Sequence, residues 1–163
     1  MSDFQQPGDG QSPDGADLSN LRIQVVGQYV KDLSFENPGA PFSFQGRPAI
    51  DLGVDLQARR MDTSRFEVEL KLRVTAKVEE KPAFLLELVY AGLFQIENAP
   101  DEMLQPILLI EAPHILFPFA RRVVADIVRD GGMPPLMIEP IDFGGLFRAK
   151  QAEMQGGGAT QSV

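Results

Sequence analysis

The sequence of 163 residues contains no cysteine, no tryptophan and only one histidine. Without cysteine the chain can form no disulfide and no thiolate metal site, and this fits a reducing compartment. The single histidine, His114, follows Pro113 and precedes an apolar run, with no Cys or Ser beside it. General acid–base catalysis needs a positioned partner, so we interpret His114 as a packed or capping side chain.

Motifs of enzyme active sites are also missing. The sequence has no G-x-S-x-G, no P-loop and no G-x-G-x-x-G pattern. An enzyme would need a metal or cofactor site built from carboxylates alone, and the pairs Asp51/Asp55 and Glu67/Glu69 are expected to be solvated on the outer faces of strands. We therefore predict a protein that is not an enzyme and has no cofactor and no metal.

The charge balance and the termini suggest where the protein works. A net charge of −8 disfavours nucleic acid and anionic lipid as partners. The N-terminus is acidic and lacks the pattern of a signal peptide, and the apolar window 83–96 is too short to span a bilayer. We expect a soluble cytoplasmic protein without stable membrane insertion. Residues 1–20 are predicted to be a disordered acidic tail and residues 149–163 a polar, Gly-rich tail, with one domain at 21–148.

Apolar and polar side chains alternate in the first half of the chain. The alternation is almost unbroken over residues 65–79 and recurs over 49–58, which predicts two strands joined by a polar turn at 61–64. Two further strands are predicted at 22–35 and 84–97. Four consecutive strands favour an antiparallel meander.

The predicted strand 84–97 is apolar on both faces. A single helical layer can cover only one of them, so we expect the face with Leu85, Val89, Ala91 and Leu93 to meet a partner or a client.

The second half of the chain is predicted to be helical. A short helix is expected at 101–110 and a longer one at 115–130, after Pro113 and before Gly131-Gly132. The apolar stripe of the longer helix is wider than one sheet face needs, which indicates a helix enclosed in an oligomer. A last helix is expected from the N-cap Asp142 towards Gln155. The fold class is α+β: a four-stranded antiparallel sheet, a long helix and a shorter C-terminal helix.

Several phrases in the same order resemble the SecB family of protein-export chaperones, and their order and spacing agree from about residue 23 to residue 147. They are YVKDLSFENP at 29–38, AGLF at 91–94, ILFPFAR at 115–121, GMPPL at 132–136 and PIDF at 140–143.

The resemblance implies a holdase that binds unfolded precursor proteins in the cytoplasm and delivers them to the SecA ATPase. It implies a homotetramer, a dimer of dimers with the long helix between dimers. The SecA-binding surface would comprise Asp32, Glu36, Leu85 and Glu87. The oligomer interface would comprise Leu116, Ala120, Val123, Val124 and Ile127.

The resemblance also implies a client-binding groove between the loop after the first strand and the last helix. Its residues would be Phe42, Phe44, Met137, Phe143, Leu146 and Phe147. Rigid aromatic rings and a flexible Met suit a site that must bind many sequences. For Phe42 and Phe44, core packing is an equal alternative. A second hypothesis for the whole chain is a structural or assembly protein that uses its apolar sheet face only for self-association.

Overall fold

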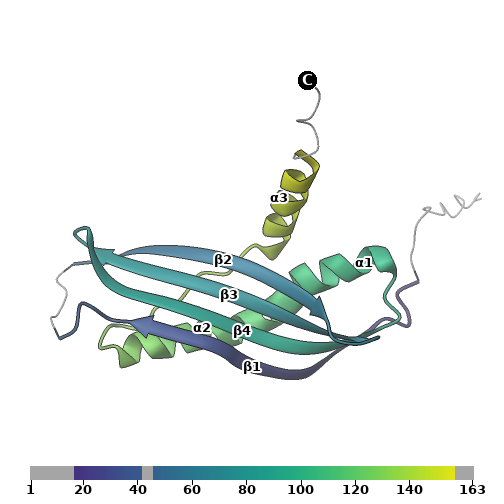
Figure 1. Cartoon of the computed structure of the whole chain (residues 1–163), viewed down its shortest axis with the longest axis horizontal. Helices are drawn as coiled ribbons and strands as arrows, with labels where there is room; N and C mark the ends of the chain where they lie inside the picture. Colours follow the sequence, from purple (N-terminus) through teal and green to yellow (C-terminus); the bar gives the residue numbers. More distant parts are fainter. Residues whose placement is uncertain (1–16, 42–45, 157–163) are drawn as a thin grey trace, which may run out of the picture.

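The computed structural model describes residues 17–41 and 46–156, and it has two layers: a sheet and a helical layer along one of its faces (Figure 1). The strands are β1 (Arg22–Glu36), β2 (Ala49–Arg60), β3 (Arg65–Val78) and β4 (Lys81–Glu97). The helical elements are α1 (Asp101–Pro106), η1 (Ile107–Glu111), α2 (Ala112–Asp130) and α3 (Phe143–Gly156). This confirms the predicted α+β class, in which an antiparallel sheet precedes the helices.

The strand order, β1-β4-β3-β2, corrects the expected simple meander. The strands β2, β3 and β4 do form consecutive hairpins, but β1 lies beside β4 at the far edge. The chain must therefore cross from β1 to β2 past two strands. Alternation within a strand specifies its faces and not its neighbours. Here the most apolar strand, β4, occupies the interior of the sheet with a neighbour on each side.

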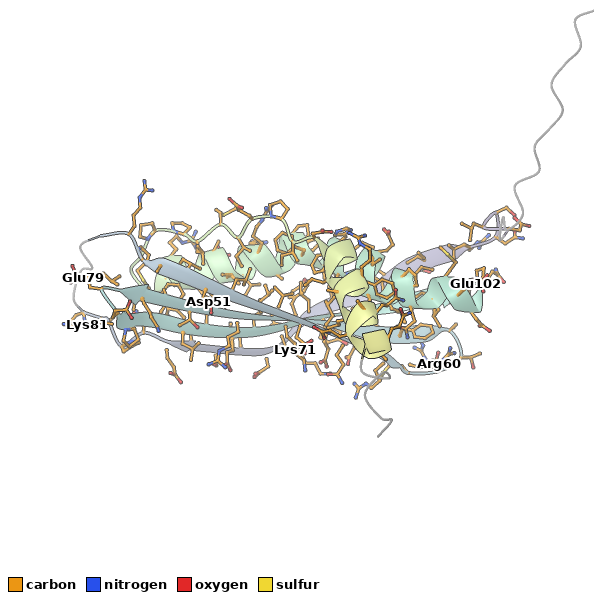
Figure 2. The ribbon with its side chains drawn as sticks, turned by 90° about the horizontal axis from the view of Figure 1, so that it is seen from above. Asp51, Arg60, Lys71, Glu79, Lys81 and Glu102 are labelled. Atoms are coloured by element: carbon orange, nitrogen blue, oxygen red, sulfur yellow. The ribbon has the colours of Figure 1, made fainter. Side chains whose placement is uncertain are left out.

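The two hairpin turns lie at opposite ends of the sheet. Figure 2 shows Arg60, next to the β2–β3 turn, at one end and Glu79 and Lys81, at the β3–β4 turn, at the other. In the first turn Asp62 accepts backbone hydrogen bonds from Ser64 and Arg65 at 3.1 and 2.9 Å, as the predicted polar turn requires. These contacts fix the β2–β3 register.

The elements α1, η1 and α2 run without a break from Asp101 to Asp130, where two helices separated near Pro113 were expected. A proline inside an α-helix removes a hydrogen bond and clashes with the preceding turn. The wider π turn η1 lies just before Pro113, and there the Ala112 N–H bonds to the Ile107 carbonyl. The π turn thus accompanies the passage of the helix through Pro113.

The long helix is long and apolar enough, by length and composition alone, to cross a membrane. It packs along the sheet, however, and the residues of α2 that face β3 and β4 are buried: Leu116, Ala120, Val124 and Val128. The helix therefore has the packing of a core helix.

The C-terminal segment leaves the two layers. After Asp130 the chain is extended, and α3 then projects past the β2 edge of the sheet (Figure 1). Asp142 caps α3 as predicted, because its Oδ1 accepts a hydrogen bond from the Gly145 N–H at 2.9 Å. The helix ends at Gly156, so residues 149–156 of the expected tail are helical.

We predict that Gly92→Ala destabilises the fold. A Cβ on Gly92, in β4, would lie 2.7 Å from Cδ2 of Leu116 and from the Phe94 ring, so α2 would have to move away from the sheet. Overpacking of this kind costs about 1–3 kcal/mol. Gly53→Ala, whose Cβ would make only ordinary contacts with Arg73, is the control. Urea unfolding at fixed protein concentration should show a lower midpoint for Gly92→Ala alone; equal midpoints would contradict the close approach.

Candidate partner and client surfaces

The four residues proposed for SecA meet on the sheet face turned away from the helices, which we call the outer face. Glu36 pairs with Leu85, Ser34 with Glu87, and Asp32 with Val89, so β1 and β4 contribute alternate positions to one patch. Asp32 and Glu36 are exposed and Leu85 and Glu87 are half-buried. The antiparallel register therefore brings together acids that are about fifty residues apart in the sequence. We call these four residues the acidic patch.

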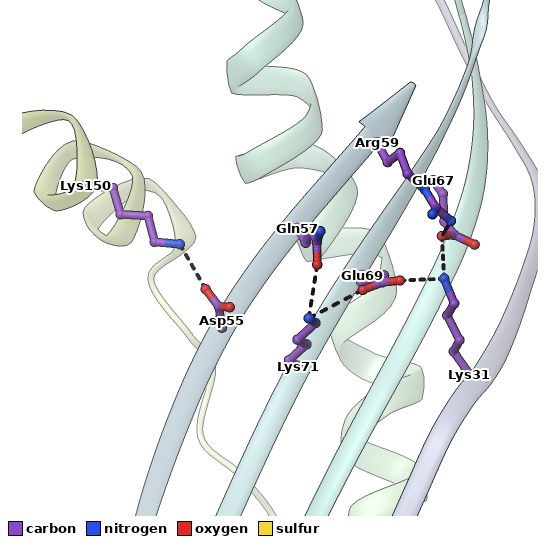
Figure 3. A network of polar contacts seen from close by, with 8 residues as sticks. All are labelled: Lys31, Asp55, Gln57, Arg59, Glu67, Glu69, Lys71 and Lys150. Atoms are coloured by element: carbon purple, nitrogen blue, oxygen red, sulfur yellow. Dashed lines mark hydrogen bonds and ion pairs between the residues drawn. The ribbon is translucent and has the colours of Figure 1, made fainter. Parts of the chain in front are cut away.

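A network of ion pairs occupies the neighbouring part of the outer face (Figure 3). Lys31 of β1 contacts Glu67 at 2.7 Å and Glu69 at 2.5 Å, and Arg59 of β2 contacts Glu67 at 2.7 Å. The Tyr29 hydroxyl also donates to Glu67. Since β4 separates β1 from β3, the bonds from Lys31 and Tyr29 pass over β4 and connect strands that are not adjacent, whereas Arg59 pairs directly with Glu67 on the neighbouring strand.

Two expectations are corrected by this network. Glu67, expected to be solvated, is only 6% exposed and is ion-paired on two sides. The outer face of β4 is also less available than expected. Ala91, which lies between Tyr29 and Glu69 in the sheet, is fully buried, and Leu85, Val89 and Leu93 are half-buried. Long polar side chains of the neighbouring strands cover much of this apolar face.

The network shifts the ionisation of its members. Hydrogen bonds from Lys31 and then Tyr29 lower the pKa of Glu67 from 4.5 to about 2. Hydrogen bonds to Glu67 and Glu69 raise the pKa of Lys31, and burial, with the Glu67 bond, raises the pKa of Tyr29. Each shift favours the charge state that the network needs.

A hollow of about 660 Å³ lies at the opposite end of the sheet from the β2–β3 turn. Its walls come from the crossover between β1 and β2, from the starts of β2 and β4, and from the segment that follows α2. We call it the crossover hollow; it is lined by Asn37, Ala40, Pro41, Gly46, Arg47, Pro48, Ile50, Val78, Ala83, Phe84, Val128 and residues 131–136. Most of this lining is apolar, so the hollow suits an apolar chain segment.

The residues proposed for the client groove are dispersed. Phe42 and Phe44 lie outside the described residues, although their neighbours Pro41 and Gly46 line the hollow. Met137 follows the lining residue Leu136 and is 62% exposed. Phe143 is fully buried, with its ring against His114 and Phe117, and is not accessible to a client in this conformation.

Leu146 and Phe147, on α3, are half-buried and are not among the lining residues. Sequence reasoning missed Ile50, which is 41% exposed in the hollow although it is on the face of β2 turned towards the helices. Alternation places Ile50 on that face, but nothing in the sequence indicates that the helical layer ends before it.

The residues proposed for the oligomer interface fall into two groups. Leu116, Ala120 and Val124 are fully buried against the chain's own sheet, whereas Val123 and Ile127 are half-buried. The exposed apolar residues of α2 lie one turn apart, at Ile115 and Phe119, in line with Val123 and Ile127. We call these four residues the outer stripe of α2.

The strand β1 continues this apolar surface. Four apolar residues of β1 that pair with buried positions of β4 remain exposed, because the helical layer does not cover them. They are Ile23, Val25, Val30 and Leu33. The Tyr90 and Phe119 rings stack at 6.5 Å beside them.

Within the residues that the structure describes, no group of three or more His, Asp or Glu side chains could hold a metal ion. His114 is exposed, although its ring contacts Phe143 edge-on with the ring centroids 5.1 Å apart.

The fold and its surfaces define a class: an α+β binding protein with an apolar hollow, an acidic sheet face and apolar surface left uncovered. Comparison with known proteins gives the family. The model of the preprotein translocase subunit SecB matches residues 16–154. The chain belongs to the SecB family.

Individual proteins of the SecB family are also similar to this chain. The chain is 52% identical to the protein-export protein SecB of Sphingopyxis alaskensis, over 90% of this chain and 88% of the relative. It is 51% identical to that of Novosphingobium aromaticivorans, over 90% and 86%. Among solved structures, a SecB-like chaperone of Mycobacterium tuberculosis, determined with a peptide from an antitoxin, matches with a TM-score of 0.64 and 20% identity, over 74% of this chain and 91% of that one. That likeness shows the fold.

Membership of the family confirms the predicted function: a cytoplasmic protein-export chaperone, not an enzyme. It also decides against the alternative of a structural or assembly protein. For a SecB protein, the implied ligands are precursor proteins.

We predict that acid weakens the fold partly through Glu67. Because folding lowers the pKa of Glu67 from 4.5 to about 2, the unfolded chain binds this proton more readily. The contribution of Glu67 is complete above about pH 4.5 and is lost as the pH falls towards about 2. Glu67→Gln should lower the free energy of unfolding at pH 7 by about 1–3 kcal/mol. The free energy of unfolding of this variant should also decrease less than that of the wild type as the pH falls. Urea unfolding from about pH 6 to 2 tests this; parallel curves for the two proteins would contradict it.

Proposed function

We propose that the chain acts as a homotetramer that binds unfolded precursor segments in the crossover hollow and delivers them to the SecA ATPase through the acidic patch. The observation that carries the proposal is the convergence of Asp32, Glu36, Leu85 and Glu87 on the outer face, whereas the hollow lies on the helical side of the same end of the sheet, where Asn37 and Phe84 line it. Client and SecA can then be bound at the same time, as a transfer between them requires.

The crossover hollow has the chemistry of a holdase site. Its lining is mostly Pro, Ala, Val, Ile, Leu and Met, and it presents few polar groups that could demand a particular sequence. Affinity then follows the apolar area that a client buries. A folded client has already buried such segments, so it has little to offer the hollow and is released without ATP.

The proposed tetramer follows from apolar surface that one subunit leaves exposed. The outer stripe of α2 and the uncovered part of β1 form neighbouring apolar areas on the helical side of the sheet. A soluble monomer rarely keeps a large contiguous patch of this kind exposed. Several linked hollows would also raise the avidity for one long client by about 10²–10⁴.

The acidic patch suits a basic partner that carries one apolar contact. Asp32, Glu36 and Glu87 supply the charge and Leu85 supplies the apolar surface between them. Complementary charge mainly raises the rate of association and the specificity, and it makes binding sensitive to salt. We infer that SecA presents a basic surface to this patch.

We predict that Ile50→Ser with Met137→Ser weakens client binding. Both side chains are exposed at or beside the hollow, so their loss should not unfold the chain. Removing one to two apolar contacts should weaken binding of a client segment by roughly tenfold. Suppression of the aggregation of an unfolded precursor, followed by light scattering, is the measurement.

Met61→Ser is the matched control, because Met61 is similarly exposed (51%) at the other end of β2. Equal suppression by the double variant and the control would show that clients bind elsewhere. Phe143→Ala is unsuitable as a test, since it would open a cavity in the core.

We predict that Glu87→Lys weakens SecA binding by roughly tenfold at low salt while client binding stays intact, because a cation replaces an anion inside the acidic patch. Isothermal calorimetry with purified SecA measures this. Glu102→Lys makes the same charge change at one end of the helical layer (Figure 2) and should bind SecA like the wild type. Unchanged affinity of the Glu87 variant would place the SecA surface elsewhere.

A further inference from the structure

The outer face has a shallow hollow of about 370 Å³ next to the acidic patch. It is lined by Asp32, Gly53, Val54, Asp55, Lys71, Leu72, Arg73, Glu87, Leu88 and Val89. Gly53 contributes no side chain on the outer face, and a Cβ there would touch only Arg73 at ordinary contact distances. The absence of a side chain at Gly53 therefore leaves room beside Arg73.

Arg73 and Glu87 lie directly opposite each other on β3 and β4, and Arg73 pairs with Gly53 on its other side. An Arg73 guanidinium nitrogen is 3.2 Å from a Glu87 carboxylate oxygen. In the free chaperone, the central carboxylate of the acidic patch thus already holds a cation of the same chain.

This pair differs from the network around Glu67. The Arg73 and Glu87 side chains are 65% and 46% exposed, and Glu87 is the one ion-pair partner of Arg73 among the described residues. Exposed pairs of this kind contribute little to stability and exchange readily with other ions. Arg73 can swing towards the space above Gly53 without breaking any other ion pair that the structure describes.

We propose that Arg73 is a resident competitor for Glu87: a basic side chain of SecA must displace the Arg73 guanidinium, which moves into the hollow over Gly53. Arg73 thereby sets the affinity of the acidic patch and rejects weakly basic ligands that cannot displace it. This inference rests on the proposed function, since it assumes that SecA binds the acidic patch.

The test is a double-mutant cycle measured by isothermal calorimetry with purified SecA, using the full-length chaperone, Arg73→Gln, Glu87→Gln and the double variant. Arg73→Gln should bind SecA about two- to fivefold more tightly, because the cost of breaking an exposed pair disappears. In the Glu87→Gln background, Arg73→Gln should have little effect on SecA binding, because Arg73 then has no carboxylate at position 87 to pair with.

Lys77→Gln is the matched control. It removes the same charge from an exposed position on the same face of β3, and it is near the acidic patch because Thr75, two residues away, pairs with Leu85. Among the residues that the structure describes, Lys77 makes no ion pair with Glu87, so it differs from Arg73 in that contact. It should bind SecA like the wild type. Circular dichroism and native mass of each variant establish that fold and assembly are retained.

Unchanged or weaker binding by Arg73→Gln, while Glu87→Gln weakens binding, would overturn the competitor role and leave the SecA surface in place. If Lys77→Gln raises SecA affinity as much as Arg73→Gln does, the gain comes from net charge alone, and the competitor role of Arg73 would be overturned as well. If Glu87→Gln binds SecA like the wild type, the acidic patch is not the SecA-binding surface. The proposed function at this site and the role of Arg73 would then both be wrong.

Discussion

The pairing of β1 with β4 is the constraint on which the other features of this protein depend. Because β1 joins the sheet beside β4 and not beside β2, the chain must cross the end of the sheet. Residues of that crossover form a wall of the crossover hollow. The same pairing brings Asp32 and Glu36 to Leu85 and Glu87. One set of backbone hydrogen bonds thus positions both proposed binding surfaces, and a shift of one residue would turn every β1 side chain to the other face.

The register is supported by side chains as well as by the backbone. Lys31 and Tyr29 reach over buried Ala91 to Glu67, and Arg59 reaches the same carboxylate from the opposite edge of the sheet. A slip of β1 would leave Glu67 with fewer partners at a site where it is almost fully buried, which is costly for a charged group. The network therefore favours one register while the adjacent acidic patch keeps its carboxylates accessible. The two groups of acids on one face thus differ in burial: Glu67 is almost fully buried, and Asp32 and Glu36 are exposed.

In the proposed function, the two faces of the sheet have different roles, one in assembly and one in SecA recognition. On the helical side, α2 covers β3 and β4 but leaves β1 and its own outer stripe exposed. On the outer side, polar side chains dominate and apolar residues are half covered. An oligomer that buries the first set leaves the second in water, so assembly and SecA binding need not compete. The crossover hollow lies at the sheet end on the helical side, where Ile50, Phe84 and Val128 line it.

The sequence alone was enough for the strands, their faces, the Asp142 cap and the α+β class, because alternation and capping are local signals. It was also enough for the family, through phrases that keep their order along the chain. The strand order, the passage of the helix through Pro113, the burial of Phe143 and the ion pairs of Glu67 were decided by tertiary structure alone. Each of these features depends on which distant segment packs against the residues concerned. That arrangement follows from placing the most apolar strand inside the sheet, and no local sequence pattern specifies it.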